Sequence, residues 1–183
     1  MQCIRSKKIT QLLAVLSIAI PLVFILLAIL LSPWFDIVNN ALSDLGHSVK
    51  SKAAPVFNIG LVTGGFLIAL VDFCMLDCSR LYRALLFLAG YDLILIGVFD
   101  EVYGSLHFYV SLIFFTILII MLLVYGVFER KYYSLSLAII SIILWYLHLY
   151  KDIPPGAAIP ELVTVAFAIP VYLSIAFEAK RSS

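Results

Sequence analysis

Residues 9–31, ITQLLAVLSIAIPLVFILLAILL, form a continuous apolar stretch without a charged side chain. A helix of about 20 such residues crosses the hydrocarbon core of a bilayer, so this stretch is long enough to do so. It ends in Ser32-Pro33-Trp34-Phe35 and has no cleavage pattern of small residues, which argues against a removed signal peptide. We therefore interpret it as a retained membrane span.

The composition extends this interpretation to the whole chain. Hydrophobic residues make up 64% and charged residues 13%, against about 45–50% and about 25% in soluble domains. Each further apolar segment should be helical, because unpaired backbone polar groups are too costly in hydrocarbon. We expect an all-α transmembrane bundle of about six helices, forming a single domain over residues 1–183. The expected spans are about 9–32, 55–76, 83–99, 106–128, 133–150 and 160–178.

The distribution of basic residues predicts the orientation. Nine of the 12 Lys and Arg residues fall on one side of the expected spans, and only Lys50, Lys52 and Lys151 fall on the other. Short cytoplasmic loops are enriched in Lys and Arg, so we expect both termini in the cytoplasm of a cell-membrane protein. The net charge of +1 gives no indication of a nucleic-acid partner.

The segment from Pro33 to Pro55 is the longest one outside the expected spans, and it falls on the outer side. Its apolar residues recur at helical spacing, which favours a short amphipathic helix lying in the outer interface. The apolar face of this helix would consist of Ile37, Val38, Ala41, Leu42 and Leu45. The polar face would consist of Asp36, Asn40, Ser43 and His47.

Most acids and every histidine also fall on the outer side, which suggests a candidate polar pocket open to the outside. Its candidate residues are Ser43, Asp44, His47, Asn58, His107, His148 and Glu161. Three imidazoles and a carboxylate would suit zinc or another divalent metal, with His47, His107 and His148 as ligands. The same residues would also suit a metal-free pocket, or they lie unconnected at helix ends.

Two of these candidates also have simpler structural explanations. Ser43 or Asp44 can satisfy backbone donors of the outer segment, which is more ordinary than a nucleophile role with His47. Glu161 follows Pro160 at the start of the last span, where a carboxylate complements the helix dipole and proline is tolerated.

Two features lie inside the expected spans. Asp92 is a carboxyl in the middle of the third span, which is a functional candidate by default because a charge there is costly. Gly60 and Gly64 form a GxxxG pattern that allows close helix approach. This pattern predicts packing within the bundle, or alternatively a homodimer or a contact with a partner in a membrane complex.

Several strings carry a resemblance that covers nearly the whole chain. They are Asn40-Ala-Leu-Ser-Asp-Leu-Gly46, Phe57-Asn58-Ile-Gly60, Gly97-Val-Phe, Gly104-Ser-Leu-His107 and Ala158-Ile-Pro-Glu161. With them the chain resembles the prokaryotic membrane family catalogued as domain of unknown function 998. The first string is also distantly similar to the six-span damage-regulated autophagy modulator proteins.

The resemblance implies six helices and an outer layer of motif residues, but it implies no activity. If the family's motif residues form a site, they correspond here to Ser43, Asp44, Asn58, His107 and Glu161. The chain departs from the expected pattern at Asp100-Glu101, where a Pro-Glu-like pair would follow Gly97-Val-Phe.

Three functional hypotheses follow. The first is a membrane protein whose outer polar pocket binds a lipid headgroup, an ion or a partner. The second is a metal-dependent membrane hydrolase acting on lipids through the three histidines. The third is an accessory subunit of a larger membrane complex, such as a respiratory assembly.

Overall fold

The chain folds into six long helices in a computed structural model that describes residues 7–74 and 79–178. All six are long and apolar enough to cross a membrane, so the prediction of an all-α bundle of about six spans is confirmed. The helices are α1 (Lys7–Leu30), α2 (Ala54–Cys74), α3 (Arg80–Val98), α4 (Ser105–Phe128), α5 (Tyr132–Lys151) and α6 (Ala158–Glu178). Two short 3₁₀ helices, η1 (Leu42–Gly46) and η2 (Glu101–Tyr103), join them.

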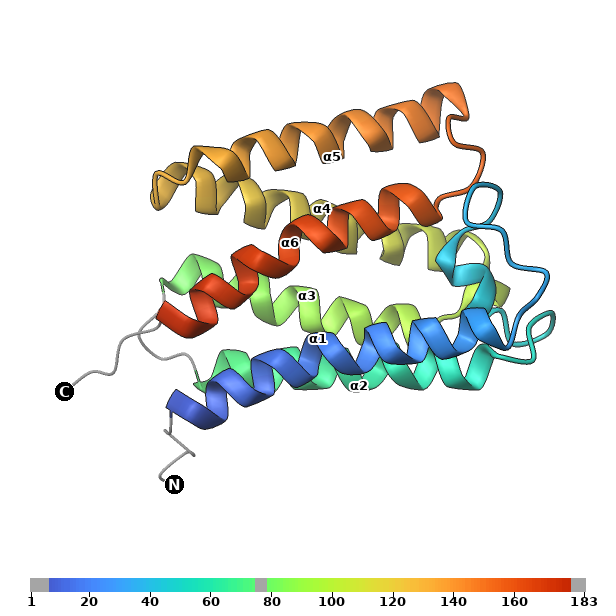
Figure 1. Ribbon diagram of the computed structural model, residues 1–183, viewed down its shortest axis with the longest axis horizontal. Helices are drawn as coiled ribbons and strands as arrows, with labels where there is room; N and C mark the ends of the chain where they lie inside the picture. The colour runs from blue at the N-terminus through green and yellow to red at the C-terminus, as the bar shows by residue number, and fades with distance from the viewer. Residues whose placement is uncertain (1–6, 75–78, 179–183) are drawn as a thin grey trace.

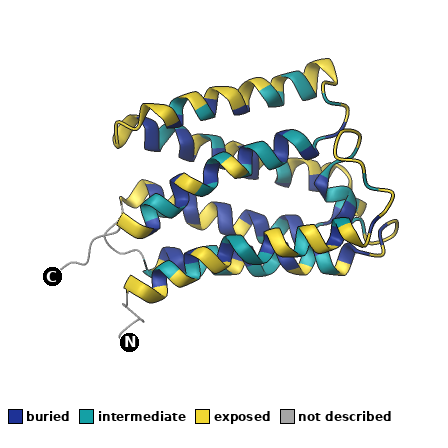
Figure 2. Ribbon diagram, viewed as in Figure 1, coloured by how far each residue is buried: buried dark blue, intermediate teal, exposed yellow. Residues whose placement is uncertain are grey.

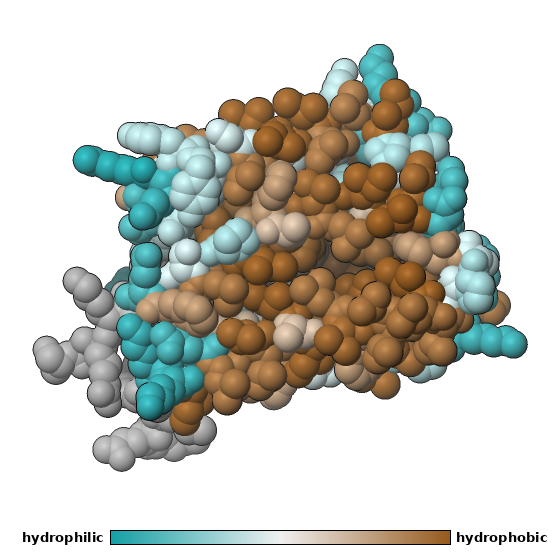
Figure 3. All heavy atoms as spheres, in the orientation of Figure 1, coloured by the Kyte–Doolittle hydropathy of each residue, from teal (hydrophilic) through white to brown (hydrophobic). Residues whose placement is uncertain are grey.

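The dimensions and surface of the bundle suit a bilayer. The shortest long helix, α3, has 19 residues, which span about 28 Å at 1.5 Å per residue. That length is close to the hydrocarbon thickness of about 30 Å. Figure 3 shows an apolar band across the middle of the molecule with hydrophilic residues gathered at both ends.

The helices pack unevenly around the interior. α2 lies tightly against both α1 and α3, whereas α1 and α6 contact each other at far fewer positions. α5 is the least buried span and lies at the side of the bundle against α4 and α6 (Figures 1 and 2). The start of α1 and the end of α6 lie at the same end of the bundle, as six antiparallel crossings require (Figure 1).

The glycines of α2 explain its close packing. Gly60 faces the Phe24 side chain and Gly64 faces the ring of Pro21, both on α1. Gly65 faces the backbone of Gly90 on α3. The GxxxG pattern therefore serves packing within the chain, and a homodimer through Gly60 and Gly64 would have to displace α1.

The segment between α1 and α2 differs from the expected amphipathic helix, and that prediction was wrong. Only Leu42–Gly46 is helical, and it is a 3₁₀ turn. Leu42 and Leu45 are buried, whereas Ile37 and Val38 remain 47% and 43% exposed. The two leucines anchor the turn in the bundle and hold it against α2, α1 and α6, so it does not lie flat in the interface.

Backbone hydrogen bonds between two distant loops hold together the end of the bundle that lies opposite the start of α1 and the end of α6 (Figure 1). We call it the outer end, after the orientation that the sequence predicts. Gly156 N donates to Val38 O at 2.8 Å and Ala158 N donates to Asn40 O at 3.0 Å. A side chain at Gly156 would overlap the backbone of Asn40, so glycine permits this close approach. We call the segment 36–47, held between α2 and α6, the outer cap.

The packing of α2 against α3 gives a first prediction. In Gly65→Ala, the added methyl group would overlap the Gly90 carbonyl oxygen, which is backbone and cannot rotate away. We expect the free energy of unfolding to fall by about 1–3 kcal/mol. Thermal unfolding in detergent measures this effect, with Phe66→Leu on the 56% exposed neighbouring side chain as the control. Equal stability of the two variants would contradict the close α2–α3 contact.

Candidate functional site

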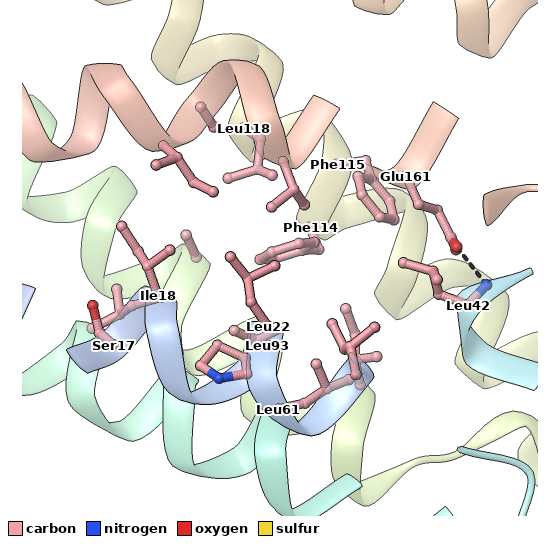
Figure 4. A pocket seen from close by; sticks show the side chains of 18 of the residues that line it. Ser17, Ile18, Leu22, Leu42, Leu61, Leu93, Phe114, Phe115, Leu118 and Glu161 are labelled. Atoms are coloured by element: carbon pink, nitrogen blue, oxygen red, sulfur yellow. Dashed lines mark hydrogen bonds between the residues drawn. The ribbon is translucent and has the colours of Figure 1, made fainter. Parts of the chain in front are cut away.

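A cavity of about 150 Å³ lies inside the bundle, beneath the outer cap. Five of the six long helices line it, α5 being the exception, and η1 contributes Leu42 and Ser43. Its walls are almost wholly aliphatic and aromatic, and Phe114 and Phe115 project into it from α4 (Figure 4). The polar lining residues are Ser17, Ser43, Ser111, Glu161 and Tyr172.

The lining residues of the cavity are spread along the helices. Glu161 stands at its outer end, and Tyr172 lies further along the same helix, where its hydroxyl is 2.9 Å from Ser17 Oγ. At 1.5 Å per residue, the stretch of α6 from Glu161 to Tyr172 is about 17 Å long, roughly half of the hydrocarbon thickness. The lining residues on α6 therefore extend over about the depth of one bilayer leaflet.

One side of the cavity approaches the surface of the bundle. Leu22 on α1 lines the cavity and is 37% exposed, and it faces the sparse contact between α1 and α6. Figure 3 shows the apolar surface hollowed between these two helices. In a membrane this apolar face would meet lipid.

Glu161 closes the outer end of the cavity. Its side chain is buried at the first turn of α6, and its Oε2 accepts the backbone N–H of Leu42 at 2.7 Å (Figure 4). This bond satisfies a backbone donor that the 3₁₀ turn leaves free, and it ties the outer cap to α6. Glu161 also lines the cavity, together with Ser43.

His107 forms a hydrogen bond with Ser111, which lines the cavity. His107 is buried in the first turn of α4, with Nδ1 2.7 Å from the Phe99 carbonyl oxygen and Nε2 3.3 Å from Ser111 Oγ. A carbonyl oxygen only accepts, so Nδ1 carries the proton, and in the neutral ring Nε2 is then the acceptor. The Ser111 hydroxyl therefore donates a hydrogen bond to His107 Nε2.

A group of carboxyls surrounds the outer cap. Asp44 Oδ2 accepts from Asn40 Nδ2 and from the backbone N–H of Ala41, which fixes the turn. Glu101 in η2 lies against Asp44, and its Oε2 is buried with no hydrogen-bond partner of good geometry among the described residues. Burial raises the pKa of Glu101 to about 7; Asp44 and Glu161 add to the rise, and Lys50 opposes it.

The structure brings together some of the predicted site residues. Ser43, Asp44 and Glu161 meet around η1, and Asn58 supports the same turn by donating from Nδ2 to Gly46 O at 3.0 Å. His107 belongs to the same region through Ser111. Of Ser43 and Asp44, it is Asp44 that accepts a hydrogen bond from a backbone N–H of the segment, that of Ala41.

The three histidines are not brought together. His47 Nδ1 accepts from Val49 N at 3.4 Å, and His148 Nδ1 lies 2.9 Å from Pro154 O beside α5. Over residues 7–74 and 79–178, no group of three or more His, Cys, Asp or Glu side chains is arranged to hold a metal ion. The zinc site proposed for His47, His107 and His148 thus finds no support in the described part of the chain.

Asp92 stands apart from the cavity lining. It is buried in the middle of α3, and within the described segments its Oδ2 has no hydrogen-bond partner. Its neighbour Leu93 lines the cavity, but Asp92 does not.

Sequence patterns did not single out Ser111 or the aromatic wall of the cavity, and they noted Glu101 only as a departure from the family pattern. Ser111 follows His107 by one helical turn, and that spacing is the one signal that would have linked them. The apolar lining carries no signal, because leucine and phenylalanine in a membrane span face lipid and interior alike.

Six apolar helices around an interior cavity define a multi-pass membrane protein. The chain matches the family model described as "Protein of unknown function (DUF998)" over residues 15–178, and it belongs to this family. No curated protein and no solved structure matches the chain.

The pKa of Glu101 gives a second prediction. Since its folded pKa of about 7 lies above the ordinary value of 4.5, the folded protein keeps a proton that the unfolded chain releases. The contribution of Glu101 to stability is therefore full below pH 4.5, falls as pH rises to about 7, and stays low above that. Glu101→Gln should remove this pH-dependent contribution to stability. The melting temperature of the variant minus that of wild type should therefore increase as the pH rises from 4.5 to about 7. A constant difference from acid to neutral pH would show that Glu101 does not hold a proton in the fold.

Proposed function

We propose that the protein binds the part of a membrane lipid nearest its polar end inside the bundle, with the polar end beneath the outer cap and the rest of the apolar chain extending between α1 and α6 toward the surrounding lipid. The observation that carries this proposal is the apolar cavity between five helices, which ends in Glu161, Ser43 and Ser111. This arrangement suits an amphiphile, because the walls are mostly apolar and the one carboxyl of the lining, Glu161, lies at the end beneath the outer cap, whereas the hydroxyls of Ser17 and Tyr172 further inside bond to each other.

The physical state of such a cavity supports the proposal. In a soluble protein, an apolar cavity of about this size stays dry and binds small apolar molecules. Here the cavity adjoins the lipid-facing surface between α1 and α6, where hydrocarbon chains are at very high concentration. Filling the space with a chain restores the dispersion contacts that the lining side chains otherwise lack.

We further propose that both termini face the cytoplasm, so that the polar end of the cavity lies at the outer leaflet. The positive-inside rule supports this orientation. Of the residues on which it rests, Arg83 lies at the start of α3 and Lys131 precedes α5. Arg5, Lys180 and Arg181 lie outside the described residues.

Two alanines on α6 provide a matched test of chain binding. Ala168 lines the cavity, whereas Ala166, two residues earlier, is exposed on the surface of the helix. In Ala168→Phe, the added ring should occupy the space that the lipid chain would fill. A loss of about 1.4 kcal/mol in binding free energy lowers the affinity for the chain tenfold, and we expect a loss of at least this size. Ala166→Phe should bind as wild type does.

The measurement is photo-crosslinking of hexadecanol that carries a diazirine in its chain, followed by identification of the labelled peptides. We expect labelling of α1, α4 and α6 in wild type and in Ala166→Phe, and its loss in Ala168→Phe. Equal labelling of both variants, or labelling confined to the exposed face of α5, would refute binding in the cavity.

The orientation has its own test. In a variant without the native cysteines, Ser48→Cys on the outer segment should react with a membrane-impermeant maleimide in intact cells. Lys131→Cys, between α4 and α5, should react only after permeabilisation. The reverse pattern would place the cavity's polar end at the cytoplasmic leaflet and overturn the proposed orientation.

A further inference from the structure

We propose that the polar head of the bound lipid is a primary amine, which Glu161 and Ser111 recognise at the outer end of the cavity. This inference rests on the proposed chain binding and adds to it the chemistry of the headgroup.

The Glu161 carboxyl offers free acceptor capacity. Its Oε2 accepts one hydrogen bond, from the Leu42 backbone N–H. An ionised carboxylate has about four lone-pair positions on its two oxygens. The group lines the cavity, so a donor in the cavity meets an acceptor that the fold has already oriented through the outer cap.

Ser111 offers a second acceptor, because of His107. Phe99 O fixes the proton on His107 Nδ1, and the hydroxyl proton of Ser111 then points to Nε2. The lone pairs of Ser111 Oγ remain for the cavity, which Ser111 also lines. His107 is thus a positioning residue that makes Ser111 an acceptor, and two acceptors favour a headgroup that donates hydrogen bonds.

The charges around the outer cap select a cation among possible donors. Asp44 lies close enough to Glu161 for the two charges to interact, and a cation bound here would also favour the ionised form of the neighbouring Glu101. The lining residues include no lysine or arginine in the described part of the chain, and Lys50 is the cation that faces Glu101. A phosphate or carboxylate head would meet repulsion and an uncompensated loss of hydration, whereas an ammonium group gains charge-assisted hydrogen bonds.

Competition between three single-chain amphiphiles of equal length tests the headgroup. Hexadecylamine, hexadecanol and palmitate each compete at pH 7 with the photoreactive hexadecanol described above. We expect hexadecylamine to compete about tenfold more strongly than hexadecanol, because hydrogen bonds to charged groups exceed neutral ones, and palmitate to compete least.

The outcomes separate the two proposals. If hexadecanol or palmitate competes as strongly as hexadecylamine, the amine assignment is overturned while chain binding stands. If none competes and the probe does not label the cavity, chain binding itself fails.

Variants of Glu161 and Ser111 test whether these two side chains produce the preference for the amine. Glu161→Gln keeps an oxygen for Leu42 N but loses the charge, so the advantage of hexadecylamine over hexadecanol should disappear. Ser111→Ala should reduce this advantage of hexadecylamine several-fold. This second variant tests the recognition even if Glu161→Gln fails to fold. Thr116→Val removes an exposed hydroxyl on the same helix and should leave the advantage unchanged. An unchanged advantage in Glu161→Gln and in Ser111→Ala would refute recognition by these groups.

Discussion

The hydrogen bond from the Leu42 backbone N–H to Glu161 Oε2 joins parts of the chain that are 119 residues apart. A polar backbone group at the edge of the hydrocarbon must find a partner within the protein, and Glu161 supplies it. The bond fixes the outer cap over the bundle while α1 and α6 touch only sparsely below it. Because α1 and α6 are joined mainly through the outer cap rather than along their length, an interior space remains between them.

The same bond gives the cavity its polarity. It brings a buried carboxyl to one end of an otherwise apolar space, beside Ser43 and near the Asp44–Glu101 pair. From the neighbouring helix α4, Ser111 lines the same cavity and bonds to His107. The polar groups of the cavity therefore come from α6, α4 and η1. None of these elements alone forms an apolar cavity with hydrogen-bond acceptors beneath the outer cap.

The membrane spans were predictable from the sequence because hydrocarbon thickness sets their length, as in α4, expected at 106–128 and found at Ser105–Phe128. The outer cap was not, since the apolar spacing of Leu42 and Leu45 suits a helix as well as a 3₁₀ turn whose leucines point inward. Asp44, Asn58 and Glu161 bond to the backbone of the cap, to which Ser43 belongs. That these residues form a site together with His107 stays a prediction. Their separation into supports (Asp44, Asn58) and cavity groups (Ser43, Glu161) depends on side-chain direction, which no spacing rule gives.

A high-resolution electron cryo-microscopy structure in native lipid tests the central claim most directly. The account predicts an elongated density between α1 and α6 that runs from Glu161 inward to the level of Tyr172, with its headgroup beside Ser111. A structure in which α1 and α6 close against each other and side chains fill the space beneath the outer cap would contradict it.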